Sequence, residues 1–169
     1  AKDCDIDAKI AELDKYFNRS KNIGGVAVNW VMYGSSNHIT KPKGLVIDNF
    51  LYRAPVGGPG TQCVKTIINT EYVKKYVNPH YPSFKFGYYK ISASDFKVVP
   101  TWHHKINEYN NLRINHYFTK SKEEWDKRHP GGKSCMSAKR TSEDFKKHDN
   151  NDIYDPSATR YSNSIINHN

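Results

Sequence analysis

The chain has 169 residues, a length that fits one domain with a core of its own. Its composition is 37% apolar and 25% charged, and no apolar run approaches the roughly 20 residues that cross a bilayer, so we expect a rather polar, soluble protein without a transmembrane segment. The net charge of +9 favours anionic partners, although a dispersed basic surface explains it equally well.

Three cysteines, Cys4, Cys63 and Cys135, lie far apart, and no C-x-x-C motif occurs. The odd number and long spacing argue against a disulfide scaffold and a structural zinc site. Free thiols suit a reducing compartment, which favours the cytoplasm, while one long-range disulfide stays possible. A place in the Golgi lumen requires a membrane anchor upstream of residue 1.

The first predicted element is a helix over residues 7–20, where Ile10, Leu13 and Phe17 recur at helical spacing. Asp7 suits its N-cap, and the glycines at 24–25 end it. Runs rich in β-branched and aromatic residues then predict strands at 25–34, 45–54, 63–70, 88–92, 96–99 and 111–118.

Between these strands, residues 71–87 predict an irregular segment with a rigid turn at 78–84. Two further helices are expected at about 122–129 and 142–148. Strands and helices mix without a regular βαβ alternation, which predicts one α/β domain over residues 1–150 with a mixed sheet and flanking helices. Residues 151–169 are polar, and we expect them to fray. No G-x-G-x-x-G or P-loop motif occurs, which argues against a dinucleotide fold.

The stretch "NLRINHYFTKSKEEWDKRHPGG", residues 111–132, combines a strand, a histidine and a helix start. Ser121 and Glu124 have the spacing of a capping box, so a helix begins just after Ser121. Free N–H groups at a helix start, with Lys120 beside them, suit phosphate oxygens. His116, at the strand end, is a candidate ligand for a divalent metal. The alternative is a half-buried His116 beside solvated charges.

This stretch resembles the strand-His-Tyr, Lys-Ser, Glu-Glu, Lys, Gly signature of family 92-like glycosyltransferases. "GGVAVNWVMYGSSNHITKPKGLVIDNFLYRA" (24–54) is similar to the family's Trp, Gly-Ser-Ser-x-His and Pro-x-Gly block. "VKTIINTEYVKKYVNPHYPSF" (64–84) resembles its Lys-centred strand and Pro-His turn. The three blocks stand in the family's order.

The resemblance implies a GT-A-type domain that transfers a hexosyl group from a nucleotide-sugar donor, with a UDP-sugar favoured, to a glycan-type acceptor. It also implies a divalent metal, with manganese favoured. His116 then completes the metal site, and Lys120 helps to neutralise the leaving diphosphate. On this hypothesis no nucleic-acid partner is expected.

One part of the family pattern is in doubt. Its metal-binding D-x-D motif follows an apolar strand upstream of the first block. Here Asp3, Asp5 and Asp7 supply the letters, but no apolar strand precedes them. We therefore expect the nucleotide-binding half to lie before residue 1, so that this chain is the C-terminal portion of the domain and is inactive alone.

Other residues are weighed more briefly. Trp30 is a sugar platform or a core residue, and Lys65 is a cleft residue or an exposed one. Asp48, between apolar residues of a predicted strand, is a weak candidate for the general base that takes the acceptor's proton. The remaining candidates form an acceptor-side loop or a plain turn: Ser35, Ser36 and His38.

Two further observations concern histidines and tyrosines. His80 braces the predicted turn, and the adjacent Trp102-His103-His104 side chains point to alternate faces, which disfavours a metal pair. The alternative function is a non-enzymatic basic module for nucleic acid or polyanions, in which the 12 tyrosines stack and the lysines contact phosphates.

Overall fold

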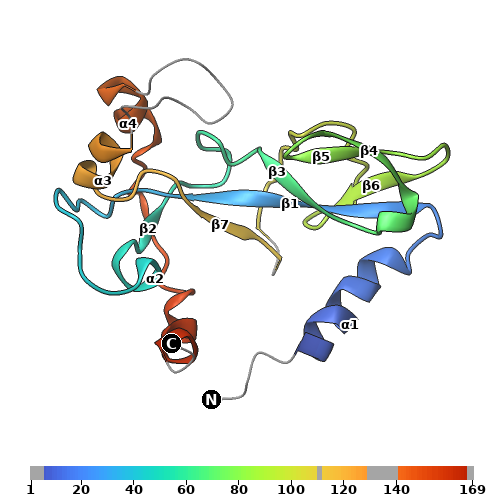
Figure 1. The fold of residues 1–169 in the computed structure, drawn as a ribbon, viewed down its shortest axis with the longest axis horizontal. Helices are drawn as coiled ribbons and strands as arrows, with labels where there is room; N and C mark the ends of the chain where they lie inside the picture. The colour runs from blue at the N-terminus through green and yellow to red at the C-terminus, as the bar shows by residue number, and fades with distance from the viewer. Residues whose placement is uncertain (1–5, 110–111, 129–140, 167–169) are drawn as a thin grey trace. The chain divides into compact units, whose positions relative to one another are not determined.

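The computed structural model describes residues 6–109, 112–128 and 141–166 (Figure 1). The chain forms two compact units: unit 1 is Ala1–Trp30 with Thr61–Ile114, and unit 2 is Val31–Gly60 with Asn115–Asn169. Helices and mixed strand pairings confirm the predicted α/β class. No helix in the described ranges has both the length and the apolar character needed to cross a membrane.

Unit 1 is built around the strand β1 (Ile23–Tyr33), which continues into unit 2. β1 pairs antiparallel with β3 (Val64–Ile68) and parallel with β6 (Tyr89–Ser92), so this sheet is mixed. The strands β4 (Val73–Asn78) and β5 (Tyr81–Phe84) form a separate antiparallel hairpin. In Figure 1 the helix α1 (Ile6–Phe17) lies on one side of β1 and this hairpin on the other.

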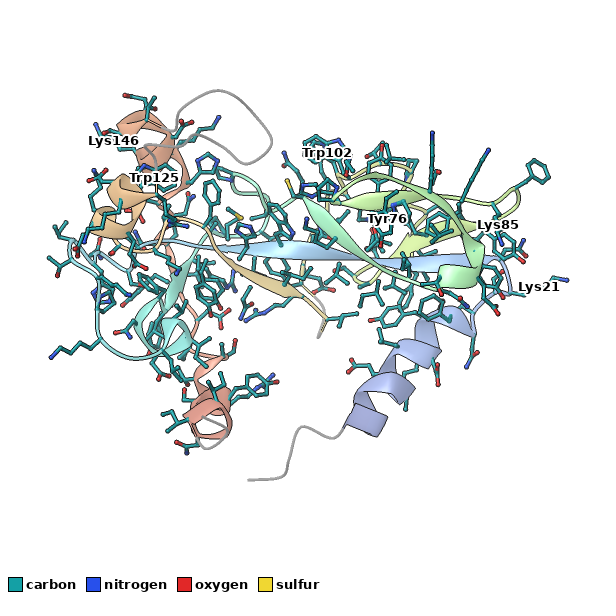
Figure 2. All side chains as sticks on the ribbon, in the orientation of Figure 1. Lys21, Tyr76, Lys85, Trp102, Trp125 and Lys146 are labelled. Carbon is teal, nitrogen blue, oxygen red and sulfur yellow. The ribbon has the colours of Figure 1, made fainter. Side chains whose placement is uncertain are left out.

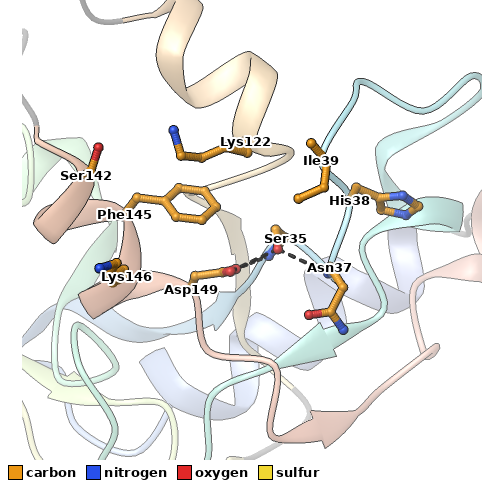
Figure 3. A pocket seen from close by; sticks show the side chains of 9 residues that line it. All are labelled: Ser35, Asn37, His38, Ile39, Lys122, Ser142, Phe145, Lys146 and Asp149. Carbon is orange, nitrogen blue, oxygen red and sulfur yellow. Dashed lines mark hydrogen bonds between the residues drawn. The ribbon is translucent and has the colours of Figure 1, made fainter.

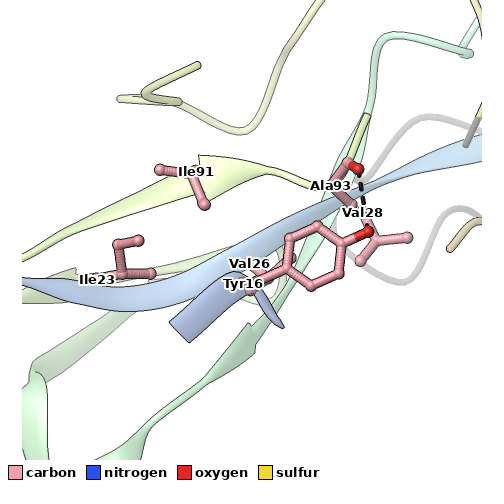
Figure 4. Close-up of a cluster of buried hydrophobic side chains, with 6 residues drawn as sticks. All are labelled: Tyr16, Ile23, Val26, Val28, Ile91 and Ala93. Carbon is pink, nitrogen blue, oxygen red and sulfur yellow. Dashed lines mark hydrogen bonds between the residues drawn. The ribbon is translucent and has the colours of Figure 1, made fainter. Parts of the chain in front are cut away.

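The alternation of side chains along β1 gives unit 1 two separate apolar clusters. Val26 and Val28 face α1, while Ala27 packs on the opposite face with Val64 and Val99. The hydroxyl of Tyr16 donates a hydrogen bond to the carbonyl oxygen of Ala93 at 3.2 Å. Figure 4 shows the first cluster: Tyr16, Ile23, Val26, Val28, Ile91 and Ala93. Phe17 packs against it, as the predicted helical face requires.

Unit 2 contains short elements. Its strands are β2 (Tyr52–Arg53), β7 (Ile114–Tyr117) and β8 (Ile153–Tyr154); β2 pairs with β8 and with the end of β1, and β7 also pairs with β1. Its helices are α2 (Val46–Asn49), α3 (Lys122–Lys127), α4 (Ser142–His148) and α5 (Ser162–Ile166). Single 3-10 turns occur at Thr70–Tyr72 in unit 1 and Thr159–Tyr161 in unit 2.

The helices α3 and α4 are the best-anchored part of unit 2. Each begins with a complete capping box, at Ser121 and at Thr141. Trp125, labelled in Figure 2, is 1% exposed, and its ring lies edge-on to Phe145 at 5.4 Å and to Phe118 at 5.6 Å. Such edge-to-face aromatic contacts add to the area that the rings bury. The helices predicted at about 122–129 and 142–148 are confirmed as α3 and α4, with α3 ending at Lys127.

Several predicted elements differ from the structure. The strand predicted at 45–54 is confirmed only at its end, as β2, and is wrong over residues 46–49. These residues form α2, because the Asn49 amide donates to the carbonyls of Leu45 and Lys43 and closes a turn. The strand at 96–99 is reduced to one bridge, Ile91↔Val98, since Phe96 has a φ of 58°.

The irregular segment predicted at 71–87 is the β4–β5 hairpin. Both central lysines of β4 face solvent, so it lacks the apolar signature of a strand. The side chain of Asn78 accepts a hydrogen bond from the His80 N–H at 2.8 Å and tightens the connection. The segment for which a fraying tail was predicted contains β8, and Asp155, which directly follows β8, forms an ion pair with Arg53 at 2.6 Å.

Candidate functional site

The Gly-Ser-Ser-x-His loop and the start of α3 are joined by backbone hydrogen bonds in unit 2. The N–H of Lys122 donates to the carbonyl of His38 at 3.0 Å, and the N–H of Glu123 to that of Ile39 at 2.9 Å. The N–H of Glu124 donates to the Ser121 hydroxyl at 3.2 Å. The first N–H groups of α3 are therefore already bonded, and the prediction that they are open to phosphate oxygens is wrong.

Lys120 precedes this helix in a left-handed conformation, with a φ of 53°. Its ammonium lies 3.4 Å from the Glu124 carboxylate. Burial acts to raise the pKa of Glu124, but hydrogen bonds from Ser121 and the charge of Lys120 outweigh it, so this pKa lies below its usual value. Glu124 therefore stays ionised, and an anion that binds Lys120 has to compete with the Glu124 carboxylate for the ammonium.

His116 lies half-buried in β7, with its ring 5.6 Å from that of Phe118. Within the described ranges, no group of three or more His, Cys, Asp or Glu side chains is arranged to hold a metal ion. Asp3 and Asp5 lie outside the described residues, and Asp7 is placed by its backbone inside α1. The described residues therefore do not form the metal centre that the resemblance implies.

A pocket of about 330 Å³ opens between the loop and the two helices α3 and α4 (Figure 3). Its lining combines the acceptor-side loop predicted from the sequence with residues that sequence reasoning did not single out: Ser35, Asn37, His38, Ile39, Lys122, Ser142, Phe145, Lys146 and Asp149. The ring of Phe145 supplies an apolar wall, and Lys122 and Lys146 bring positive charge. Such a mixture of an apolar wall and a few polar groups is typical of small-molecule sites.

Asp149 fixes the floor of this pocket. Its carboxylate accepts hydrogen bonds from the Ser35 N–H at 2.5 Å and from the Ser35 hydroxyl at 3.0 Å, as Figure 3 shows. The amide of Asn151 donates to the same carboxylate at 3.1 Å. Ser35 is 2% exposed. The N–H and the hydroxyl of Ser35 are thus both engaged in holding the loop. A ligand in this pocket therefore has to contact the other lining residues.

Ser36 and Gly34 shape the same loop. The Ser36 hydroxyl accepts hydrogen bonds from the N–H groups of Leu51 and Tyr52 at 2.8 and 3.1 Å. A Cβ at Gly34 would stand 2.5 Å from the carbonyl oxygen of Asn150, closer than van der Waals contact allows. The motif letters Gly34 and Ser36 therefore have structural roles. His38 lines the pocket, and its Nε2 donates to the Asn49 carbonyl at 3.0 Å.

Asp48 does not lie where the sequence placed it. It belongs to the helix α2 instead of a strand, its side chain is exposed, and its carboxylate accepts a hydrogen bond from the Ser162 hydroxyl. It is absent from the lining of the described pocket. The argument for a general base depended on a half-buried strand position, and that premise is wrong.

The other predicted residues, Trp30 and Lys65, meet in unit 1. The Lys65 ammonium donates to the carbonyl of Pro79 at 2.8 Å and lies 5.8 Å from the centre of the Trp30 ring. His80 stands between Trp30, at 5.3 Å, and Trp102, at 5.7 Å. Burial first, and then the charge of Lys65, lower the pKa of His80, so its imidazole is neutral near pH 7.

Sequence reasoning missed that Trp102 belongs to this cluster. Trp102 is 39% exposed and is labelled in Figure 2 near β3 and β5. The neighbouring His103 ring lies against it, while His104 bonds to the Asp95 carboxylate at 2.8 Å. The available signal was the presence of a tryptophan in a polar segment, but its partners are distant in sequence.

Comparison of the chain with protein-family models, curated proteins and solved structures found no match. The functional argument therefore depends on the residues and their geometry.

Proposed function

We propose that this chain is a glycosyltransferase of the GT-A type, or the C-terminal portion of one. It would transfer a sugar from a nucleotide-diphosphate donor to a glycan-type acceptor, with a divalent metal. One observation carries the proposal: the Gly-Ser-Ser-x-His loop and the Lys-Ser-x-x-Glu helix start, about 80 residues apart, bond to each other and line one pocket. Both segments belong to the blocks that resemble family 92-like enzymes.

The pocket has the chemistry of an acceptor subsite. The Phe145 ring offers a flat apolar face to a sugar ring, while His38 and Asn37 offer polar groups to its hydroxyls. The exposed Lys146 and the half-buried Lys122 add positive charge. The ammonium of Lys122 lies 2.6 Å from both carboxylate oxygens of Asp126, and this ion pair holds its side chain at the edge of the pocket.

On the donor side, the proposal keeps Lys120 as the cation that meets the diphosphate. It requires the ammonium to leave Glu124, and their 3.4 Å contact, between side chains that are 32% and 16% exposed, is the interaction that the diphosphate has to replace. His116 stays the proposed metal ligand. Its partners in coordination must come from outside the described residues, and no chemical step is derived through the metal.

The test is calorimetric titration of UDP and UDP-sugars into the chain, with and without manganese. We expect manganese-dependent binding that is lost in His116→Ala and weakened about tenfold in Lys120→Ala. His103→Ala, an exposed histidine of unit 1, serves as the matched control. Metal-dependent binding that survives His116→Ala contradicts the assignment. A chain that binds no nucleotide in either condition contradicts a complete donor site within these residues, and the C-terminal-portion form of the proposal fails if a version extended upstream in the native gene binds none either.

A second function is favoured by the surface of the β4–β5 hairpin. Cations and aromatic rings alternate there: Lys74, Lys75, Tyr76, Lys85 and Phe86 are exposed, with Tyr76 60% and Phe86 fully exposed. Tyr76 and Lys85 are labelled in Figure 2. Interleaved aromatic and basic side chains bind single-stranded nucleic acids through stacking and phosphate contacts.

Salt dependence separates this second function from the first. A polyanion module binds a short oligonucleotide with an affinity that falls steeply with salt, needs no metal and is weakened in Tyr76→Ala. A glycosyltransferase binds the UDP-sugar in 200 mM salt and is indifferent to Tyr76→Ala. Oligonucleotide binding without any nucleotide-sugar binding would favour the polyanion-binding module and refute the glycosyltransferase proposal.

A further inference from the structure

Lys90 is a buried cation in the mixed sheet of unit 1. It lies in β6, opposite Gly25 of β1, and is 3% exposed. Its neighbour Ile91 faces the α1 side of the sheet and belongs to that cluster. Because successive side chains of a strand point to opposite faces, Lys90 points to the other face, where β5 lies.

The ammonium of Lys90 has few partners there. It donates one hydrogen bond, to the carbonyl of Thr101 at 2.7 Å, and it lies 4.6 Å from the centre of the Tyr81 ring. No carboxylate of the described residues lies within ion-pair distance of it. An ammonium carries three N–H donors. The Thr101 carbonyl and the Tyr81 ring face do not use all of them, so Lys90 can still donate a hydrogen bond to an anion.

The same side chain lines a cavity of about 190 Å³. The other lining residues are mostly aromatic or proline: Tyr81, Pro82, Ser83, Phe84, Tyr89, Val99 and Pro100. Prolines have no N–H to offer, and Lys90 is the sole cationic side chain of this lining. An engineered apolar cavity of about 150 Å³ binds benzene, so this one has room for a ring with a small substituent.

A buried ammonium without an anion is expensive for the fold. Burial lowers the pKa of Lys90 from 10.5 to about 8, so the side chain is still mainly protonated at pH 7. A leucine or methionine fills such a site at lower cost. A ligand that brings a negative charge offsets this cost, and one that also brings a flat apolar body fills the space between the rings.

We propose that this cavity of unit 1 binds a small aromatic carboxylate, with the carboxylate at Lys90 Nζ and the ring against Tyr81 and Phe84. The site is independent of the proposed glycosyl transfer, because none of its residues lines the pocket of unit 2. Recognition depends on charge and ring together: an apolar ring alone leaves the ammonium without an anion, and an inorganic anion alone leaves the aromatic walls uncovered.

The first experiment titrates benzoate, benzyl alcohol and inorganic phosphate into the wild-type chain at pH 7, followed by calorimetry and by the backbone amide signals of residues 81–90. We expect benzoate to bind at least tenfold more tightly than either of the other two, with shifts at the cavity. Equal binding of benzyl alcohol, tighter binding of phosphate, or no binding of benzoate overturns the proposal.

The second arm uses a variant pair. Lys90→Met keeps an unbranched side chain, one atom shorter, but removes its charge, and we expect it to weaken benzoate binding at least tenfold. Lys21→Met, an exposed lysine of the same unit labelled in Figure 2, should bind as wild type does. Unchanged binding in Lys90→Met contradicts the site. The comparison of the three ligands on wild type stands even if a variant folds poorly.

A pH series adds a check on the charged form. The titratable groups that line the cavity are Lys90, Tyr81 and Tyr89. As the amine of Lys90 loses its proton above about pH 8, we expect benzoate affinity to fall about ten- to thirtyfold between pH 7 and pH 9.5. Affinity that stays constant over this range shows that the carboxylate does not sit at Lys90.

Discussion

Replacing Lys90 with methionine should stabilise the folded chain in the absence of ligand. The lowered pKa of Lys90, about 8 against 10.5 for a solvated lysine, corresponds to about 3 kcal/mol at about 1.4 kcal/mol per pH unit. That free energy is what the folded state loses by holding the ammonium away from water. Methionine avoids it, at the loss of the Thr101 hydrogen bond, worth about 1 kcal/mol.

The net expectation at pH 7 is therefore a gain of about 2 kcal/mol in the free energy of unfolding. The sign of its pH dependence follows from proton binding. Between about pH 8 and pH 10.5 the unfolded chain holds a proton on Lys90 that the folded chain has lost, so the stability of wild type rises with pH there. Below about pH 8 the full penalty applies, and above 10.5 it is absent. The advantage of Lys90→Met should shrink across this window.

Urea denaturation at pH 7 and at pH 10 measures this advantage directly. Other lysines and tyrosines have ordinary pKa values near 10, so the difference between Lys90→Met and wild type is compared with that of the exposed Lys21→Met control. The control should show no stability gap at either pH. A Lys90→Met variant that is less stable than wild type at pH 7, or whose gap is the same at both pH values, refutes the claim of a desolvated amine.

Three further changes test the loop, the helix start and an acid-sensitive ion pair. Gly34→Ala should destabilise unit 2 by about 1 to 3 kcal/mol in urea melts, because its Cβ would stand 2.5 Å from a backbone oxygen; a neutral effect contradicts the packing of the loop. Ser121→Ala should cost about 1 to 2 kcal/mol and Thr141→Ala about half that, because the first cap is fully buried and the second exposed; equal losses would falsify the ranking. Burial acts to raise the pKa of Asp95, but hydrogen bonds, first of all the one from His104, lower this pKa to about 2. The ionised carboxylate therefore stabilises the fold above about pH 4, and this contribution is lost as the pH falls through 2. Asp95→Asn should therefore remove about 2 kcal/mol at pH 6 and make no difference at pH 2 in thermal melts.

The elements that the sequence predicted well are those whose signals are local. The helices after Ser121 and Thr141 carry their caps and their buried aromatic residues within one or two turns. The buried strand β1 is a run of apolar residues and glycines in which Asn29 is the one polar residue. Where the signal was ambiguous, local hydrogen bonds decided: the residues at 45–54 have strand-like composition, but Asn49 closes a turn. The β4–β5 hairpin was missed because two lysines interrupt the apolar pattern of β4 and a proline stands within β5.

The site could be predicted less well, because it depends on contacts across long stretches of chain. Ser35 and His38 were singled out, but nothing local indicates that Asp149 fixes Ser35 or that Phe145 completes the pocket. Lys90 carries a signal that could have been used: a charged residue inside a short predicted strand demands a partner or a reason. Its neighbours in the cavity come from three separate segments of unit 1.

The loop at 34–38 bears on how the resemblance to glycosyltransferases is interpreted. Its letters Gly34, Ser35 and Ser36 are fully engaged in holding the loop, through close backbone approach and hydrogen bonds. Residues with such roles resist substitution whether or not they touch a substrate, since each supports the position of its neighbours. Chemistry at this pocket must therefore come from side chains that the loop positions, of which His38 is the nearest. A binding defect in a Ser35 variant reports loop geometry, whereas one in a His38 or Lys146 variant with an intact fold reports contact with the ligand.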